Sequence, residues 1–376
     1  MKAIVNATVI GQGQAWPGYA IVFDQRIRAV GPQALVQNWP VDELIDADGL
    51  IVAPGLIDIH IHGCGGSETM DATPEALETM ATCLAQYGVT SFVPTTMTAE
   101  WEQVEKAITN VRQLQGNSRA GARILGVHLE GPFLNPEFKG AHDAQHLALP
   151  DFQLIVDYLD VIRIITLAPE MEGSATFLEH LKAYPQIVAA IGHSGAGYET
   201  VTWAMEQGIR HTTHLFNAMA PFHHREPGVI GAVLALGLSA ELIADNLHVH
   251  PGLYSLLLKT HGPAGLILVS DAMRAAGLGD GEYDFGGQGV RVRDGAARLP
   301  SGTLAGSVLT LNRAVINFQR ATGCPLAEAI AMASRNPARL LGLHQHIGDL
   351  AVGLEADIII MDGNGQVHRT FIGGQG

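Results

Sequence analysis

The feature of this sequence that most restricts its fold is a series of eight short apolar runs separated by segments with helical signals. The runs cover residues 56–62, 90–96, 124–129, 161–169, 187–193, 211–216, 242–248 and 266–271. Thr73-Pro74 begins one helical pattern between two runs, and Gly88 ends it. Pro325 and Pro337 predict two more helices after the last run. Eight strand-plus-helix units in 376 residues predict an α/β fold, a (β/α)8 TIM-like barrel.

The two ends of the chain have a different pattern, with short β-prone runs separated by Gly, Pro and Asp turns. At the carboxyl end, residues 357–361 and 367–372 flank the turn Asp362-Gly363-Asn364-Gly365. We therefore expect a small discontinuous β-sandwich domain built from residues 1–53 and 348–376, with the barrel over residues 54–347.

Side chains that can bind a metal collect where the predicted strands end. His60 and His62 close the first run, and the strand period of two puts both imidazoles on one face. Because the carboxyl ends of barrel strands meet at one face, residues that end other runs should lie near them. Imidazole and carboxylate ligands without thiolate fit Zn²⁺ best, with Fe²⁺, Mn²⁺ or Co²⁺ as alternatives. The predicted ligands of one or two divalent ions are His60, His62, Glu130, His193 and His214.

Each of these residues also has a simpler explanation. A single buried histidine is more often a hydrogen-bonded core residue than a ligand, and Asp271 alone could be a helix N-cap. The coincidence at several strand ends favours a metal centre, and beside it Asp271 is predicted as a base. His128 lies two residues before Glu130, so a supporting role behind the ligands stays open. Residues expected to lie outside the centre are Cys64, His223, His224, His344 and His346.

A metal centre of this kind indicates a hydrolase. A divalent ion lowers the pKa of bound water to about 7, which gives a nucleophile at neutral pH. Asp271 could accept the proton of that water and deliver it to a leaving nitrogen. The metal, with a histidine such as His142, would stabilise the developing oxyanion.

The composition of the chain excludes two classes of binding partner. Lys and Arg number 22 against 37 Asp and Glu, a formal net charge of −15, and no basic run is present to bind nucleic acid. The sequence has no apolar stretch of 18 residues, so no membrane partner is expected. Three scattered cysteines indicate a reducing compartment, and residues 1–10 lack the pattern of a signal peptide. We expect a cytoplasmic protein.

Several motifs resemble those of a known family. Residues 54–63, PGLIDIHIHG, resemble the first-strand signature of the amidohydrolase superfamily, and residues 336–342, NPARLLG, resemble its carboxyl-terminal signature. HLEGPFL at 128–134 and THLFNAM at 213–219 are similar to motifs of the members that deacetylate amino-sugar phosphates. The resemblance covers nearly the whole chain in order.

The resemblance implies roles for individual residues. Glu130, His193 and His214 would hold a metal, and Asp271 would be the catalytic acid and base. His60 and His62 could complete a second site, with Glu130 as the bridging ligand. It also implies a homodimer in which the loop of Arg225 can reach the neighbouring site. The implied sugar and phosphate contacts are Ala141, His142, Asn217, Ala218, Arg225, Asp245, Asn246, Leu247, His248, Leu304, Ala305 and Gly306.

The activity implied by the resemblance is hydrolysis of the acetamido group of N-acetyl-D-glucosamine 6-phosphate. The products would be glucosamine 6-phosphate and acetate, as amino-sugar catabolism requires. One alternative keeps the family and changes the substrate to N-acetylgalactosamine 6-phosphate or another N-acyl compound. An alternative of another class is a non-catalytic barrel scaffold, which the complete set of metal ligands disfavours.

Overall fold

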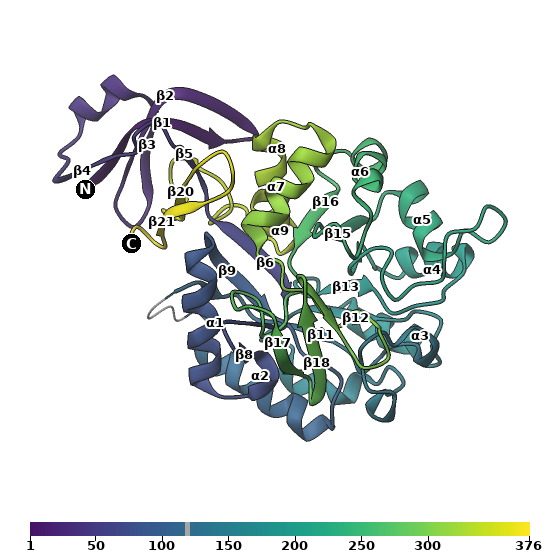
Figure 1. Ribbon diagram of the computed structural model, residues 1–376. Helices are drawn as coiled ribbons and strands as arrows, with labels where there is room; N and C mark the ends of the chain where they lie inside the picture. The colour runs from purple at the N-terminus through teal and green to yellow at the C-terminus, as the bar shows by residue number, and fades with distance from the viewer. Residues whose placement is uncertain (117–120) are drawn as a thin grey trace.

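The computed structural model describes residues 1–116 and 121–376 and has an α/β fold with a curled layer of parallel strands (Figure 1). β11 to β16 pair side by side in chain order, and β6 pairs with β9, which also pairs with the short β10. Each of the eight predicted runs overlaps at least one of these strands, and the run 124–129 overlaps both β10 and β11, which confirms the α/β class. Their bounds are β6 Leu56–Ile61, β9 Val89–Pro94, β10 Arg123–Ile124, β11 Val127–Glu130, β12 Ile162–Leu167, β13 Val188–Ile191, β14 His211–Thr212, β15 Ser239–Ile243 and β16 Leu266–Val269.

Two isolated parallel bridges connect these sheets at both of their edges. Thr95, just after β9, pairs with His128 of β11, and Ile61 of β6 pairs with Ala272, just after β16. The strands are buried almost throughout, because helices cover them from outside and apolar side chains fill the inside. The carboxyl ends of all these strands are therefore brought around one centre.

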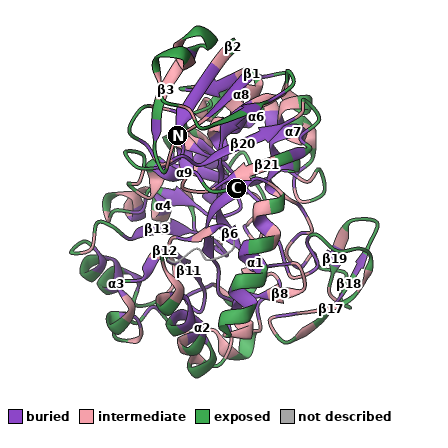
Figure 2. Ribbon diagram, turned by 90° about the vertical axis from the view of Figure 1, so that its left-hand side faces the viewer, coloured by how far each residue is buried: buried purple, intermediate pink, exposed green. Residues whose placement is uncertain are grey.

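The helices lie outside the parallel strands, and most of them have a buried face and an exposed face (Figure 2). Thr73 caps α1 as the sequence predicts, because its hydroxyl accepts a hydrogen bond from the backbone N–H of Ala76 and Pro74 takes the first position. None of the helices in the described parts of the chain is long and apolar enough to cross a membrane. The bounds are α1 Pro74–Gln86, α2 Trp101–Leu114, α3 Ser174–Leu181, α4 Tyr198–Glu206, α5 Gly228–Leu236, α6 Tyr254–His261, α7 Leu311–Thr322, α8 Leu326–Met332 and α9 Arg335–Leu340.

Strands from both ends of the chain form one mixed sheet, seen at the upper left of Figure 1. Its order is β21-β20-β5-β1-β2-β3, and β4 pairs with β1 beside β5. The sheet has an apolar core of its own, in which Phe23 meets Phe371 edge-on with ring centres 5.3 Å apart. The strands are β1 Lys2–Gly11, β2 Gln14–Phe23, β3 Ile27–Pro32, β4 Glu43–Asp46, β5 Ile51–Pro54, β20 Ile358–Met361 and β21 Val367–Phe371.

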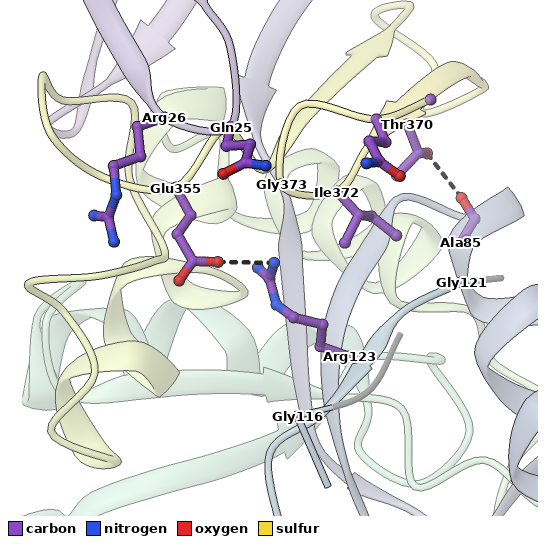
Figure 3. Close-up of a pocket in the computed structure, with 12 residues that line it drawn as sticks. Gln25, Arg26, Ala85, Gly116, Gly121, Arg123, Glu355, Thr370, Ile372 and Gly373 are labelled. Atoms are coloured by element: carbon purple, nitrogen blue, oxygen red, sulfur yellow. Dashed lines mark hydrogen bonds and ion pairs between the residues drawn. The ribbon is translucent and has the colours of Figure 1, made fainter. Parts of the chain in front are cut away.

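Charged and polar contacts tie the mixed sheet to the parallel layer at a hollow between them (Figure 3). Arg123 Nη1 lies 2.8 Å from Glu355 Oε2, and its Nη2 pairs with the buried carboxylate of Asp357. The Thr370 hydroxyl donates to the carbonyl of Ala85 at 2.7 Å. Burial raises the pKa of Asp357 to about 6, although the Arg123 charge opposes this rise.

A small antiparallel sheet that the sequence analysis did not predict follows β16. It consists of β17 Gly281–Phe285, β18 Gln288–Arg293 and β19 Ala296–Arg298. One face, which includes Val290 and Val292, packs on an apolar cluster next to the strand ends, while the other face carries exposed arginines. A two-stranded ladder of β7 Gly63–Cys64 and β8 Ser67–Glu68 follows β6.

Candidate metal centre

The end of the first parallel strand brings two imidazoles into contact with two carboxylates. His60 Nε2 lies 3.3 Å from His62 Nε2. Oε2 of Glu130 lies 3.4 Å from the first of these nitrogens and 3.2 Å from the second. Oδ1 of Asp271 lies 3.2 Å from His62 Nε2 and 3.5 Å from His60 Nε2. Four donor atoms thus face a common point.

A second group of donor atoms shares the other oxygen of Glu130. Its Oε1 lies 3.0 Å from His214 Nε2 and 3.3 Å from His193 Nε2, and the two imidazole nitrogens are 2.9 Å apart. All three side chains are buried. The Glu130 carboxylate therefore stands between the two groups, as a bridging ligand would.

The arrangement fits a divalent cation. Glu130 Oε1 is buried and has no hydrogen-bond partner within residues 1–116 and 121–376. In each group two imidazole nitrogens lie within hydrogen-bond distance of each other and close to a carboxylate oxygen. These atoms can offer lone pairs to a shared cation. Nitrogen and oxygen donors without sulfur suit Zn²⁺, and also Fe²⁺, Mn²⁺ or Co²⁺. The buried histidine and carboxylate groups are consistent with metal binding, and they do not identify the metal.

A carboxylate that the sequence analysis missed orients the ligands from behind. Glu241 lies inside β15, and its Oε2 accepts hydrogen bonds from His60 Nδ1 at 2.8 Å and from the backbone N–H of His214 at 3.0 Å. Its Oε1 lies 3.1 Å from His211 Nε2. The only sequence signal that could have identified Glu241 was a charged residue directly before the predicted apolar run 242–248. With Nδ1 of His60 donating to Glu241, Nε2 faces the metal position as a lone pair.

The backbone turns sharply at the strand ends that carry this chemistry. His193, His214 and Asp271 have φ angles of 51°, 29° and 48°, in the left-handed region that residues with a Cβ rarely adopt. Such conformations persist where surrounding contacts fix them, and they are common at functional sites. His193 Nδ1 donates to the carbonyl of Phe138 at 2.9 Å, which fixes its ring with Nε2 toward Glu130.

His128 is adjacent to this centre, yet both of its ring nitrogens are used by the scaffold. Nδ1 donates to the carbonyl of Ile59 at 3.2 Å, and Nε2 accepts from the Thr166 hydroxyl at 2.7 Å. Burial and the nearby His60 charge lower the pKa of His128 to about 3, so its ring is neutral. The structure therefore gives His128 a positioning role beside His60.

The residues expected outside the centre lie elsewhere. Cys64 is buried, and its thiol contacts the carbonyl of Ala276 at 3.6 Å. The other four residues of this set are exposed to solvent: His223, His224, His344 and His346.

Protonation of the metal-free centre follows from its charges. Burial favours the neutral form of His62, but Asp271 and Glu130 outweigh burial and raise its pKa to about 9. Burial opposes ionisation of Glu130, but the His60 charge and the close approach of the imidazoles of His142, His193 and His214 hold its pKa well below the usual range. The pKa of Asp271 is also lowered, because the charges of His60 and His62 outweigh burial. Metal binding must therefore release protons.

A cavity of about 370 Å³ opens over the centre. His142 lines it, and the Nδ1 atom of this residue accepts from the backbone N–H of Thr98 at 3.2 Å, which leaves the ring proton on Nε2, 3.5 Å from Glu130 Oε2. The predicted residues that line the cavity are His62, Glu130, Ala141, His142, His193, His214, Asn217, Ala218, His248, Asp271, Leu304 and Gly306.

Some predicted contact residues do not line this cavity within the described chain. Arg225 is exposed, and its Nη1 lies 2.9 Å from His224 Nε2. Asp245 contacts the lining residue His248, because its Oδ2 lies 2.6 Å from the Nδ1 of that ring. The remaining predicted contact residues that do not line the cavity are Asn246, Leu247 and Ala305. The predicted metal ligand His60 is buried and does not line it either. The lining residues that sequence reasoning missed are Met97, Gly140, Phe285, Arg298 and Thr303.

Comparisons by family model, by sequence and by structure all find similarity to amidohydrolases or to deacetylases of amino-sugar phosphates. A model of the amidohydrolase family matches residues 51–375. N-acetylglucosamine-6-phosphate deacetylase of Bacillus subtilis is 40% identical over 95% of this chain and 92% of its own. N-acetylgalactosamine-6-phosphate deacetylase of Escherichia coli O157:H7 is 37% identical over 94% of each chain. A mutant N-acetyl-D-glucosamine-6-phosphate deacetylase of Mycobacterium smegmatis, solved with N-acetyl-D-glucosamine-6-phosphate, has a TM-score of 0.91 at 32% identity and covers 100% of this chain and 98% of its own.

Proposed function

This chain belongs to the amidohydrolase family, and from that premise we propose that it is a metal-dependent deacetylase of N-acetyl-D-glucosamine 6-phosphate. It removes the acetyl group from the 2-acetamido nitrogen and yields glucosamine 6-phosphate and acetate, a step of amino-sugar catabolism. The observation that carries this proposal is the Glu130 carboxylate, shared between two buried histidine groups at the base of a cavity that Asp271 also lines.

We infer that the eight parallel strands act as a closed (β/α)8 barrel over residues 54–347. The bridges at Thr95 and Ile61 support closure, and the candidate centre lies at the carboxyl ends of the strands, where barrel enzymes place their active sites. Residues 1–53 and 348–376 would then form one separate β-sandwich domain.

The residues of this chain have defined tasks in the reaction. Glu130 and its histidines would hold a divalent ion, which would lower the pKa of water toward neutrality. The Asp271 carboxylate accepts a proton from the attacking water as the new C–O bond forms at the acetyl carbon. The same proton then passes to the amide nitrogen as the C–N bond breaks. His142 carries its ring proton on Nε2 toward the cavity and donates to the oxygen that becomes negative.

The sugar phosphate would bind at the end of the cavity that His248 lines. Asp245 holds that imidazole and favours its charged form, which outweighs burial and raises the pKa of His248. Arg225 does not line the cavity of its own chain, so its assignment as a phosphate contact requires a homodimer in which it reaches the partner's site.

One relative favours a second substrate of the same class. Because a deacetylase of N-acetylgalactosamine 6-phosphate is 37% identical to this chain, the galacto epimer is the alternative to test. A non-catalytic scaffold would be free to lose ligands, whereas every member of both donor groups is present here.

Acetate release by the zinc-loaded protein tests the proposal. The substrates are N-acetylglucosamine 6-phosphate, its unphosphorylated form and N-acetylgalactosamine 6-phosphate. We expect the first to give a kcat/KM at least about tenfold higher than the second, because charge-assisted bonds to phosphate contribute more than about 1.4 kcal/mol. Equal kcat/KM values for the phosphorylated and unphosphorylated sugars would show that the enzyme does not recognise the phosphate. A higher kcat/KM for N-acetylgalactosamine 6-phosphate would make that sugar the assigned substrate.

A further inference from the structure

The small antiparallel sheet after β16 brings one arginine to the cavity over the metal centre. Arg298 ends β19, and its backbone pairs with Leu304 across a short hairpin. Thr303, Leu304 and Gly306 of the same hairpin line the cavity together with the Arg298 side chain. The hairpin thus forms one wall of the cavity and carries a cation on it.

The Arg298 guanidinium has unused donors. Its Nη1 donates to the carbonyl of Gly302 at 2.8 Å, and no carboxylate within residues 1–116 and 121–376 pairs with it. The other two arginines of this small sheet have carboxylate partners. Arg291 Nε lies 2.6 Å from Glu282 Oε1, and Arg293 Nε lies 3.6 Å from Asp294 Oδ2. Arginine has five N–H donors, and a guanidinium can bind two phosphate oxygens at once.

A histidine whose charged form is favoured by a neighbouring carboxylate, His248, lines the same cavity. His248 bonds through Nδ1 to Asp245 at 2.6 Å, and its Nε2 has no hydrogen-bond partner in the described residues. Arg298 is close enough for its charge to lower the pKa of His248, against the raising effect of Asp245. Two neighbouring positive groups repel each other, so their shared placement in a chain of net charge −15 is typical of a site for an anion.

We propose that Arg298 binds the phosphate of the substrate from within the same chain, together with His248. This inference rests on the proposed function and deepens it, because it names the group that recognises the phosphate. Both arginines are exposed, but Arg298 lines the cavity within its own chain and Arg225 does not. Phosphate recognition would then begin within each subunit.

Kinetics of Arg298→Ala in the zinc-loaded enzyme, at 0.15 M salt, test the proposal. We expect KM for N-acetylglucosamine 6-phosphate to rise about 10- to 100-fold, the loss typical of hydrogen bonds between charged groups, with kcat changed much less. The values for unphosphorylated N-acetylglucosamine should stay the same. Arg298→Lys should recover part of the loss, because it restores the charge without the planar fork. Arg291→Ala is the matched control, since it removes the same charge from the same small sheet outside the cavity.

Direct binding separates this inference from the proposed function. Calorimetry with glucosamine 6-phosphate, glucosamine and inorganic phosphate should show that Arg298→Ala weakens only the phosphate-containing ligands. If the wild-type protein releases no acetate, the proposed function fails, and the binding comparison still decides the role of Arg298. Equal effects on phosphorylated and unphosphorylated ligands, or a KM within about twofold of wild type, would overturn it.

Discussion

Replacing Glu241 by glutamine should weaken metal binding without unfolding the protein. The carboxylate is fully buried, and it accepts hydrogen bonds from His60, from the backbone of His214 and from His211. A glutamine oxygen can keep the first two bonds. Its NH₂ group would then face His211 Nε2 and donate to it. The ring proton of His211 can move to Nδ1, because the Ser239 oxygen lies 2.7 Å from that nitrogen and can accept a hydrogen bond from it.

The expected loss of metal affinity follows from the lost negative charge of Glu241. Carboxylates behind metal-bound histidines make the ligand more basic, and their removal lowers metal affinity about 10- to 100-fold. Glu241→Ala would be a poorer test, because it leaves buried imidazole N–H groups unpaired and can cost about 3 to 5 kcal/mol of stability. We therefore expect Glu241→Gln to show a weaker zinc affinity, with turnover at saturating zinc reduced much less.

The assay is a competition titration of metal-free protein with zinc and a chelator of known affinity, beside thermal unfolding followed by circular dichroism. Glu282→Gln is the matched control, since it neutralises an exposed carboxylate paired with Arg291. A folded Glu241→Gln protein with zinc affinity within about twofold of wild type would refute the supporting role of Glu241.

Three further predictions concern other parts of the chain. Asp271→Asn should stay folded and metal-loaded while turnover falls about 100-fold or more, because an amide cannot carry the proton; near-wild-type turnover would refute its role. Arg225→Ala should mainly raise KM for the phosphorylated sugar, and an unchanged KM would count against that contact. Burial raises the pKa of Asp357 to about 6, so its contribution to stability is present below pH 4 and is lost as pH rises through 6. Urea unfolding of metal-free protein should therefore show Asp357→Asn gaining up to about 3 kcal/mol relative to wild type between pH 4 and pH 7, and a pH-independent difference would contradict this.

The parallel strands were predictable because they are buried on both sides and therefore consist of apolar runs. The polar residues at their ends were predictable for the same reason, since a histidine such as His193 interrupts the apolar pattern where a strand stops. Helix starts were visible where a cap and a proline coincide, as at Thr73. Pro337 was less informative, because α9 begins at Arg335.

The missed features depend on contacts that no local pattern contains. Glu241 is one charged residue within a strand, and only the packing of His60 and His211 around it shows why it is tolerated. The strand β18 has an alternating pattern of valine and arginine that could have been recognised. The nearness of Arg298 to His248 depends on how that small sheet folds back over the cavity.

Anomalous diffraction at the zinc edge from crystals of the zinc-loaded protein tests the metal assignment most directly. We expect a peak about 2.0 to 2.2 Å from His193 Nε2, His214 Nε2 and an oxygen of Glu130. Full occupancy would add a second peak beside His60 and His62. Crystals with no peak between these side chains, or with zinc bound only elsewhere, would contradict a metal-dependent hydrolase centred on Glu130.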